Sequence, residues 1–366
     1  MLAWTRYPTH YRSVEVRAIS AAVKTGASVM VVGLSGAGKS NLLGFLAHRA
    51  ADVFPSGVQV AHVDGNRLTD FSLAGFYRLV AGALESPPSR ESPGGPFADL
   101  EASLNRRLQA PESSLCLLLD LSLLLDSTGR LFGEHDRAIF GNLRALRDNH
   151  KFQLTYVAAT RHPLPPDTEL SELFYANTLC LGGLDQPDAR WSIADFAVRA
   201  GLDWRDAAVA AIIELSGGFP SLLRAICEAH AAGAPLDLPA LAAHPAVRAR
   251  LLEFWADHPT DAELQAAGLL ENRLLMAGRP AQFDTSRLTA KEHLLLQFLL
   301  AQAGRVCDKD EVIRAVWPED HVFDRGVRDD SLAQLVHRLR TKIEPDPANP
   351  QYLHTVAGRG YRLDAP

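Results

Sequence analysis

The stretch VVGLSGAGKSNLL, from Val31 to Leu43, determines the fold expected for the first half of the chain. It contains the pattern G-x-x-x-x-G-K-[ST], which begins at Gly33 and ends at Lys39 and Ser40. In such a loop the glycines let backbone amides curl around phosphate groups, the lysine offers a charge to the β- and γ-phosphates, and the hydroxyl binds Mg²⁺. The sequence therefore predicts a nucleotide site, with ATP or ADP and Mg²⁺ as its ligands.

The loop and the helical turn after it supply the first set of expected nucleotide contacts. An apolar run precedes the loop and a helical pattern, Asn41–His48, follows it, as this motif requires. The N-terminus of that helix offers further amides to an anion. The contacts expected from this segment are Gly33, Ser35, Gly36, Ala37, Gly38, Lys39, Ser40 and Asn41.

Short apolar runs alternate with helical patterns through the first half of the chain. Such alternation predicts a parallel α/β sheet, and runs without polar alternation fit strands that are covered on both faces. Helical patterns such as Phe71–Leu84 and Arg137–Asp148 separate the runs, while Glu85–Phe97 and Arg161–Leu170 have the composition of loops. The expected strands are Val29–Val32, Val58–Val63, Leu115–Leu119, Leu154–Ala159 and Thr178–Leu181.

A second acidic group for the metal is expected at Asp120, where the apolar strand LCLLLD ends. An aspartate in this place binds Mg²⁺ together with the P-loop hydroxyl, so Ser40 and Asp120 are the predicted metal ligands. Lys39 and Asp120 are the candidate catalytic residues. The next residue is Leu121, where many related ATPases carry a glutamate that polarises the attacking water. The sequence thus predicts nucleotide binding with slow hydrolysis at most, and leaves open whether the chain is an enzyme.

The fourth expected strand ends in Thr160 and Arg161. At this place a polar side chain can reach the γ-phosphate, and the alternative is a strand end that only meets solvent. The P-loop, Asp120, the ATR triplet at 159–161 and the later segment LSGGFPSLLRAI together resemble the STAND branch of AAA+-related signalling ATPases, over about residues 10–230.

That resemblance implies further nucleotide contacts. Gly218 and Pro220 match a Gly-x-Pro that touches the nucleotide from the lid, and Arg161 matches a sensor arginine. Arg224, one helical turn beyond Pro220, is either a second sensor or an arginine that faces solvent. Three helical patterns with glycine stops follow Asp185, and more helix is expected from about Pro239 to Met276.

The last eighty or so residues predict three helices and a β-hairpin. Thr289 and Glu292 have capping-box spacing at the start of the first helix, whose expected apolar face is Leu294, Leu295, Phe298 and Leu299. Pro318 stops the second helix. The third begins near Asp329 or Asp330, and the hairpin bends at Gly358 and Gly360. The buried stripe expected on the third helix is Leu332, Leu335, Val336, Leu339 and Ile343.

Within residues 287–363 the motifs LTAKE, GRV, VW, RLRTKIEPDP and TVAGRGYRL closely resemble the OmpR-type winged-helix effector domain of bacterial response regulators. The resemblance implies that the third helix enters the major groove of double-stranded DNA and that the hairpin wing reaches the minor groove or its phosphates. In relatives the loop before the third helix touches RNA polymerase, and here that loop is acidic. The implied DNA contacts are His337, Arg338, Arg340, Thr341, Lys342, Thr355, Arg359 and Arg362.

Composition limits the other possibilities. The net charge of −6 excludes a basic coat over the whole protein but allows a local basic patch. The cysteines are widely spaced and form no zinc-binding pattern. The N-terminus lacks the apolar core of a signal peptide, and the longest apolar run is too short to cross a bilayer, so a cytoplasmic protein without membrane contact is expected.

The predicted organisation is an α/β P-loop core at 1–183, a helical lid with connecting helices at 184–280, and a winged-helix DNA-binding domain at 281–366. We expect a nucleotide-switched transcription regulator that forms homo-oligomers under ATP control and contacts RNA polymerase or another regulatory protein. One alternative is a DNA-remodelling ATPase of the origin-recognition or transposition-regulator kind. Another is a signalling scaffold whose winged helix binds protein.

Overall fold

The structure, a computed structural model, describes residues 3–84, 94–122, 136–168, 170–279, 283, 287–317 and 329–364. The chain divides into two compact units, Met1–Gly278 and Arg279–Pro366. Among the described residues no helix is long and apolar enough to span a membrane.

A parallel sheet of five strands organises the first unit, in the order β2-β3-β4-β1-β5. This confirms the predicted α/β class. The strands coincide closely with the apolar runs of the sequence. The three central strands are buried between two layers of helices, whereas the two edge strands are partly exposed. Their bounds are β1 (Val29–Val32), β2 (Val58–Asp64), β3 (Ser114–Asp120), β4 (Leu154–Thr160) and β5 (Thr178–Cys180).

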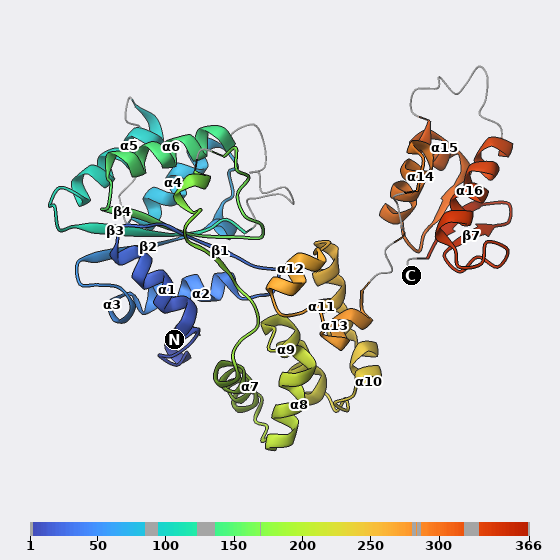
Figure 1. Ribbon diagram of the computed structural model, residues 1–366, viewed down its shortest axis with the longest axis horizontal. Coiled ribbons are helices and arrows are strands. Elements are labelled where there is room, and N and C mark those ends of the chain that lie inside the picture. The colour runs from blue at the N-terminus through green and yellow to red at the C-terminus, as the bar shows by residue number, and fades with distance from the viewer. Residues whose placement is uncertain are drawn as a thin grey trace. The chain divides into compact units, whose positions relative to one another are not determined.

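Helices cover both faces of this sheet (Figure 1). One face carries α1 (Ser13–Lys24), α2 (Lys39–His48) and α3 (Ala50–Val53). The other carries α4 (Leu73–Ala83), α5 (Gly95–Arg107) and α6 (Asp136–Asn149). Neighbouring strand residues point to opposite faces, so Val31 belongs to the first core and Met30 to the second. Short 3-10 turns lie at Ala3–Arg6, Gly65–Arg67 and Ser171–Leu173.

The loop predicted at Glu85–Phe97 is wrong at its C-terminal end. Gly95–Phe97 open the helix α5, because a proline fits the first helical positions, where a backbone donor is not needed. The rest of the predicted loop, up to Pro93, lies outside the described residues. Sequence analysis missed α5 itself, although Leu100 and Leu104 are fully buried at helical spacing.

The chain after the sheet is helical, as predicted from Asp185. Gly201 and Gly217 end two of these helices in the left-handed conformation, with φ of 67° and 59°. The helices share their apolar core with the sheet face that carries α1 and α2, so both belong to one unit. They are α7 (Gln186–Ala200), α8 (Asp206–Ser216), α9 (Pro220–Ala231), α10 (Leu238–Ala243), α11 (Pro245–Ala256), α12 (Asp261–Ala266) and α13 (Arg273–Ala277).

The second unit contains the three predicted helices and the predicted hairpin, plus a short strand that sequence analysis missed. That strand, β6, pairs antiparallel with the hairpin and completes a sheet of order β6-β8-β7. The described elements are α14 (Ala290–Ala301), β6 (Val306–Asp308), α15 (Lys309–Val316), α16 (Asp329–Ile343), β7 (Leu353–Val356) and β8 (Gly360–Leu363).

The apolar face predicted for α14 is wrong at one position. Leu294 is 39% exposed, whereas Leu296 is buried beside Leu295 and Leu299. The helix packs against both α15 and α16, so its buried surface is rotated away from Leu294. The predicted stripe of α16 is fully buried, which confirms that face of the helix.

Glu344 fixes the junction between α16 and the wing. Its side chain is buried, and its carboxylate accepts hydrogen bonds from the backbone N–H groups of Gln351, Tyr352 and Leu353. Gly360 packs against β6 so closely that a Cβ atom would lie 2.0 Å from the carbonyl oxygen of Cys307. These two residues explain why the motifs IEPDP and GRGY accompany a wing of this shape.

Candidate functional site

The strand order gathers three expected nucleotide contacts at one edge of the sheet. Because β4 lies between β1 and β3, Val32 pairs with Thr160 and Ala159 pairs with Asp120. The carboxyl ends of parallel strands all face the same way, so the P-loop, Asp120 and Thr160 meet there.

The P-loop connects β1 to the N-terminus of α2. Gly36 and Gly38 adopt φ of 82° and 90°, which side chains rarely tolerate. The buried ammonium of Lys39 donates to the carbonyl oxygens of Gly33 at 2.7 Å and Leu34 at 3.3 Å. Burial lowers the pKa of Lys39 to about 8, although the charge of Asp120 opposes this shift. The loop is therefore closed on itself around a cation of reduced basicity.

The other predicted P-loop contacts differ in their exposure. Ser40 and Asn41 are exposed in the first turn of α2, where a hydroxyl and backbone amides are available to an anion or a metal. Ala37 is buried. Ser35 is half-buried.

Buried polar atoms without partners mark the same edge. Asp120 Oδ2, Thr160 Oγ1 and Arg161 Nη2 have no hydrogen-bond partner within the described part of the chain. Asp120 is 3% exposed and Thr160 is 0% exposed, so bulk solvent does not reach these atoms. Each such atom costs about 1–3 kcal/mol unless something satisfies it. A carboxylate oxygen and a hydroxyl at the sheet edge that carries the P-loop fit Mg²⁺ and phosphate oxygens.

The lid segment touches the P-loop directly. The backbone N–H of Ser221 donates to the carbonyl oxygen of Gly36 at 3.2 Å, and a Cβ on Gly38 would lie 3.7 Å from Pro220 Cγ. Gly218 has φ of 70° and lies against the backbone of Leu184. Pro220 therefore lies beside the P-loop at the start of α9, and Gly218 shapes the turn that leads to it.

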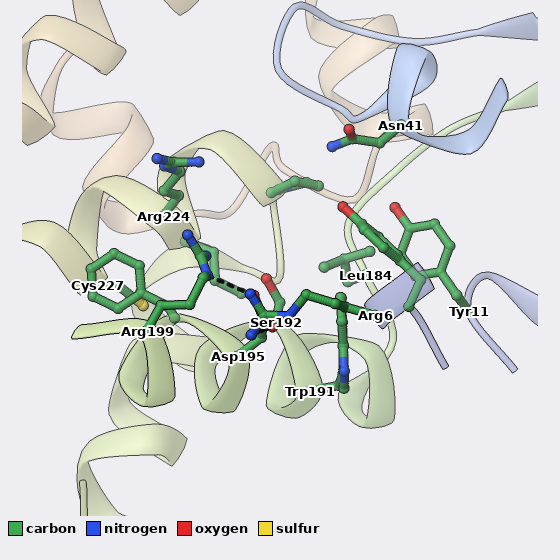
Figure 2. A pocket seen from close by; sticks show the side chains of 14 residues that line it. Arg6, Tyr11, Asn41, Leu184, Trp191, Ser192, Asp195, Arg199, Arg224 and Cys227 are labelled. Carbon is green, nitrogen blue, oxygen red and sulfur yellow. Dashed lines mark hydrogen bonds and ion pairs between the residues drawn. The ribbon is translucent and has the colours of Figure 1, made fainter. Parts of the chain in front are cut away.

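A cavity of about 740 Å³ opens next to Asn41 and Pro220 (Figure 2). The N-terminal segment, α2, α7 and α9 all contribute to its wall. Arg224 lines it from α9, with its guanidinium paired to Glu228 at 2.9 Å. Its wall consists of Arg6, Tyr7, Tyr11, Asn41, Leu184, Trp191, Ser192, Asp195, Phe196, Arg199, Pro220, Leu223, Arg224 and Cys227.

Aromatic rings and one carboxylate give this cavity its character. The ring of Tyr7 lies 4.7 Å from that of Tyr11 and 4.6 Å from that of Trp191, measured between centroids. Asp195 pairs with Arg6 and, at 2.9 Å, with Arg199. Burial, with the negative neighbours, raises the pKa of Tyr7 to about 12. No sequence pattern predicted these residues, because the N-terminal segment and α7 lie far apart in the chain and meet only in the folded protein.

Arg12 is another residue that sequence analysis missed. Its buried guanidinium donates to the carbonyl oxygens of Ala37 in the P-loop, at 2.9 Å, and of Gly182 after β5, at 3.0 Å. Its backbone N–H donates to the buried carboxylate of Asp188 in α7 at 2.7 Å. Arg12 thus ties the P-loop to the start of the lid.

Arg161 is held by carboxylates from the helical region. Its Nη1 lies 2.9 Å from Glu263 Oε1 and its Nε lies 3.5 Å from Asp257 Oδ2. His162 Nδ1 also lies 3.0 Å from Glu263 Oε1. Arg161, which was predicted to be a sensor arginine, is therefore already paired with acids from the end of α11 and from α12.

In the second unit, part of the predicted DNA surface is exposed. His337, Arg338 and Thr341 lie on the outer face of α16, and Arg359 lies in the bend of the wing. A shallow hollow is lined by Ala333, Gln334, His337 and Arg338.

The remaining predicted DNA contacts take part in the internal structure of the domain. Arg340 donates to the carbonyl oxygen of Leu353 and to Thr355 Oγ1, both at 2.9 Å. Lys342 lies 2.5 Å from the buried carboxylate of Glu292. Arg362 donates to Asp364 at 2.7 Å.

Comparison with known proteins bears on this second unit. Residues 284–363 match the family described as "Transcriptional regulatory protein, C terminal". Residues 284–363 are an OmpR-type winged helix. The sensory transduction protein RegX3 of Mycobacterium tuberculosis is 46% identical over 81 residues, which are 22% of this chain and 34% of that protein. The transcriptional regulatory protein AfsQ1 of Streptomyces coelicolor is 38% identical over 80 residues, again 22% and 34%. The chain spans about a third of the length of these relatives.

Solved structures with a distant likeness to the whole chain include Cdc6p from Pyrobaculum aerophilum. It is 13% identical with a TM-score of 0.40, covering 98% of this chain and 92% of that chain. The structure of Drosophila ORC bound to DNA is 13% identical with a TM-score of 0.43, covering 90% of this chain and 85% of that chain.

Proposed function

We propose that the chain is an ATP-binding transcription regulator in which the bound nucleotide controls how the winged helix is presented to DNA. The observation that carries this proposal is the set of buried polar atoms at the P-loop edge that have no partner in the described part of the chain, together with a winged helix of regulator type on the same chain. The proposed organisation keeps the core at 1–183, the helical lid at 184–280 and the DNA-binding domain at 281–366.

In the first unit the phosphates lie against the P-loop amides and Lys39. Ser40 and Asp120 are the proposed ligands of Mg²⁺, which when bound neutralises charge on the phosphate oxygens. Thr160 Oγ1 supplies a donor at the γ-phosphate side. The aromatic cavity beside Asn41 takes the base and ribose, and Arg224 lies at its wall. Because the buried Leu121 follows Asp120, no carboxylate stands next in the strand to activate water, and binding rather than turnover is the working step.

In the second unit α16 enters the major groove. Arg338 is the proposed base or phosphate contact, with His337 and Thr341 beside it, and Arg359 reaches the groove or its phosphates from the wing. Arg340 and Thr355 brace the wing against α16 in the structure. Lys342 and Arg362 have partners inside the domain, so they are proposed as weaker contacts at the edge of the DNA surface. One winged helix makes few contacts, so paired copies are needed for tight operator binding. ATP-dependent assembly into a homo-oligomer supplies this avidity. The homo-oligomer is cytoplasmic and binds RNA polymerase or another regulatory protein.

The test is a selection of genomic DNA fragments by the purified protein, run in parallel with ATP and with ADP, with the oligomer mass measured on the same samples. We expect one sequence class to be enriched with ATP only, together with a rise in mass. The Lys39→Ala variant is expected to lose both effects at saturating ATP. If the same DNA fragments are enriched and the oligomer mass is the same with ATP and with ADP, the nucleotide does not switch DNA binding. If DNA stimulates the hydrolysis of ATP, the result favours a remodelling ATPase instead.

A further inference from the structure

At the end of β4 the helical region contacts the sheet edge that carries the P-loop, Asp120 and Thr160. Arg161 is 9% exposed there, and its guanidinium pairs with Glu263 and Asp257. Its Nη2 atom is buried without an acceptor in the described residues. The guanidinium is therefore only partly satisfied by the two acids, and one of its donors is still available to a further anion.

Each of the two acids lies within reach of the P-loop in a different way: Glu263 shares a cavity with it, and Asp257 acts on the charge of Lys39. Glu263 and Arg161 line the same small cavity as Gly33 and Leu34, the residues whose carbonyl oxygens receive Lys39. The charge of Asp257 raises, and that of Arg161 lowers, the pKa of Lys39. An anion that arrives next to Lys39 and Arg161 therefore meets the field of these carboxylates. Solvent screens the half-buried Glu263 weakly, whereas it screens Asp257 more strongly because that side chain is 39% exposed.

We infer that Asp257 and Glu263 are specificity-determining residues that disfavour a nucleoside triphosphate by occupying Arg161 where the γ-phosphate would otherwise bind it. The inference rests on the proposed function. A diphosphate ends at the P-loop and leaves the pairs intact. A triphosphate adds charge on the Arg161 side, where it repels both carboxylates and competes for the same guanidinium.

Glu263 cannot follow a guanidinium that turns towards the phosphate. Its Oε2 accepts from the backbone N–H of Thr260 at 2.8 Å and from Thr260 Oγ1 at 3.0 Å, which fixes it in the capping box of α12. Burial by itself raises the pKa of Glu263, but the Thr260 bonds and the Arg161 charge outweigh it, so this pKa lies below its usual range. The carboxylate stays charged at neutral pH, and His162 is the other group that faces it.

The experiment measures the dissociation constants of ADP and of a non-hydrolysable ATP analogue, with Mg²⁺, for the full chain and for the D257N/E263Q double variant. We expect the triphosphate to bind about tenfold more tightly to the variant, a typical size for coupling between two groups. The diphosphate is expected to change by less than about threefold, because it does not reach Arg161. The amide introduced by E263Q keeps an acceptor for the Thr260 N–H, and thermal unfolding checks that the fold is retained.

E253Q is the matched control, since it removes one carboxylate from α11 whose partner is the exposed Arg250. It is expected to change neither affinity. If the double variant unfolds, D257N alone must still raise the triphosphate affinity. When Arg161 is also replaced by alanine, the double substitution must no longer change the ratio of the triphosphate affinity to the diphosphate affinity, because the effects of coupled residues are not additive.

An unchanged ratio of the two affinities, or an equal loss of both, overturns the inference while leaving nucleotide binding in place. Failure of the unaltered protein to bind either nucleotide overturns the proposed function itself.

Discussion

The sheet edge that carries the P-loop, Asp120 and Thr160 and the outer face of α16 arrange their polar side chains in opposite ways. At the sheet edge Asp120 and Thr160 are almost fully buried, and each has an oxygen without a partner among the described residues. On α16 the exposed polar residues, such as His337 and Arg338, are solvated, while Arg340 and Lys342 already hold partners inside the domain. The first arrangement suits an enclosed ligand of fixed geometry, and the second suits a large polyanion bound across a surface.

This difference implies different energetics at the two places. A group removed from the sheet edge is not replaced by water, so its partner on the ligand remains unsatisfied and the loss is large. A cation removed from α16 is one of several, and salt screens each of them. We therefore expect single substitutions to act strongly at the P-loop and moderately on the helix.

The largest effect is expected for Lys39→Ala. The ammonium is buried, and its removal leaves the phosphates without their central charge, which costs about 3 kcal/mol or more. Affinity for Mg²⁺-nucleotide should fall at least about 100-fold in a titration with a fluorescent nucleotide, since about 1.4 kcal/mol is tenfold. Lys24→Ala, at the exposed end of α1, is the matched control. A loss below about fivefold would falsify the assignment of the P-loop as an enclosed phosphate site.

An intermediate effect separates two cations of α16. Arg338→Ala should weaken DNA binding by about 1–2 kcal/mol, roughly tenfold, with the same melting temperature, because the side chain is exposed. Lys342→Ala leaves the buried Glu292 carboxylate unpaired, so it should lower the free energy of unfolding by about 1–2 kcal/mol.

For Lys342→Ala, DNA affinity measured on the folded protein should stay within about threefold, as the ammonium is engaged inside the domain. Binding isotherms and thermal unfolding on the same preparations distinguish the two variants. If Lys342→Ala instead weakens DNA binding as much as Arg338→Ala without loss of stability, the contrast between engaged and exposed cations on this helix does not hold.

The sequence predicted those parts of the fold in which one local signal suffices. Each strand of the sheet is a short apolar run, and the α16 stripe follows the helical period, so both were found. α5 was missed, because the proline- and glycine-rich segment before it hides a helix start at Gly95. The Leu294 error arose because helical period alone does not tell which of two packed neighbours, α15 or α16, sets the buried side.

The candidate site was predictable to the same extent. The P-loop and Asp120 carry motifs, so they were named from the sequence alone. The cavity wall joins Arg6 to Asp195, and Arg161 meets Asp257 and Glu263, only through tertiary contacts. Such pairs have no local signature, because residues far apart in sequence are brought together by strand order and helix packing.

The smallest expected effect is a dependence of nucleotide binding on pH. Burial places the pKa of Lys39 at about 8 without ligand, and bound phosphate raises it by adding negative charge. Well below the ligand-free pKa, Lys39 is already charged before the nucleotide binds. Above that pKa, Lys39 must take up a proton when the nucleotide binds. Affinity should therefore fall progressively as the pH rises from about 8 to 9.5, the sign that linkage gives for a pKa raised on binding.

The same pH range isolates Lys39 from its surroundings. The pKa values of Tyr7 and Cys227 in the cavity wall both lie at about 12, so neither changes charge there. Guanidinium groups do not titrate in proteins, so DNA binding measured at fixed oligomeric state should remain flat over this interval. A flat nucleotide profile contradicts a buried lysine of lowered pKa at the phosphates. If DNA affinity also falls steeply over this pH range, the exposed face of α16 does not differ from the buried P-loop site in its pH dependence, which contradicts the comparison.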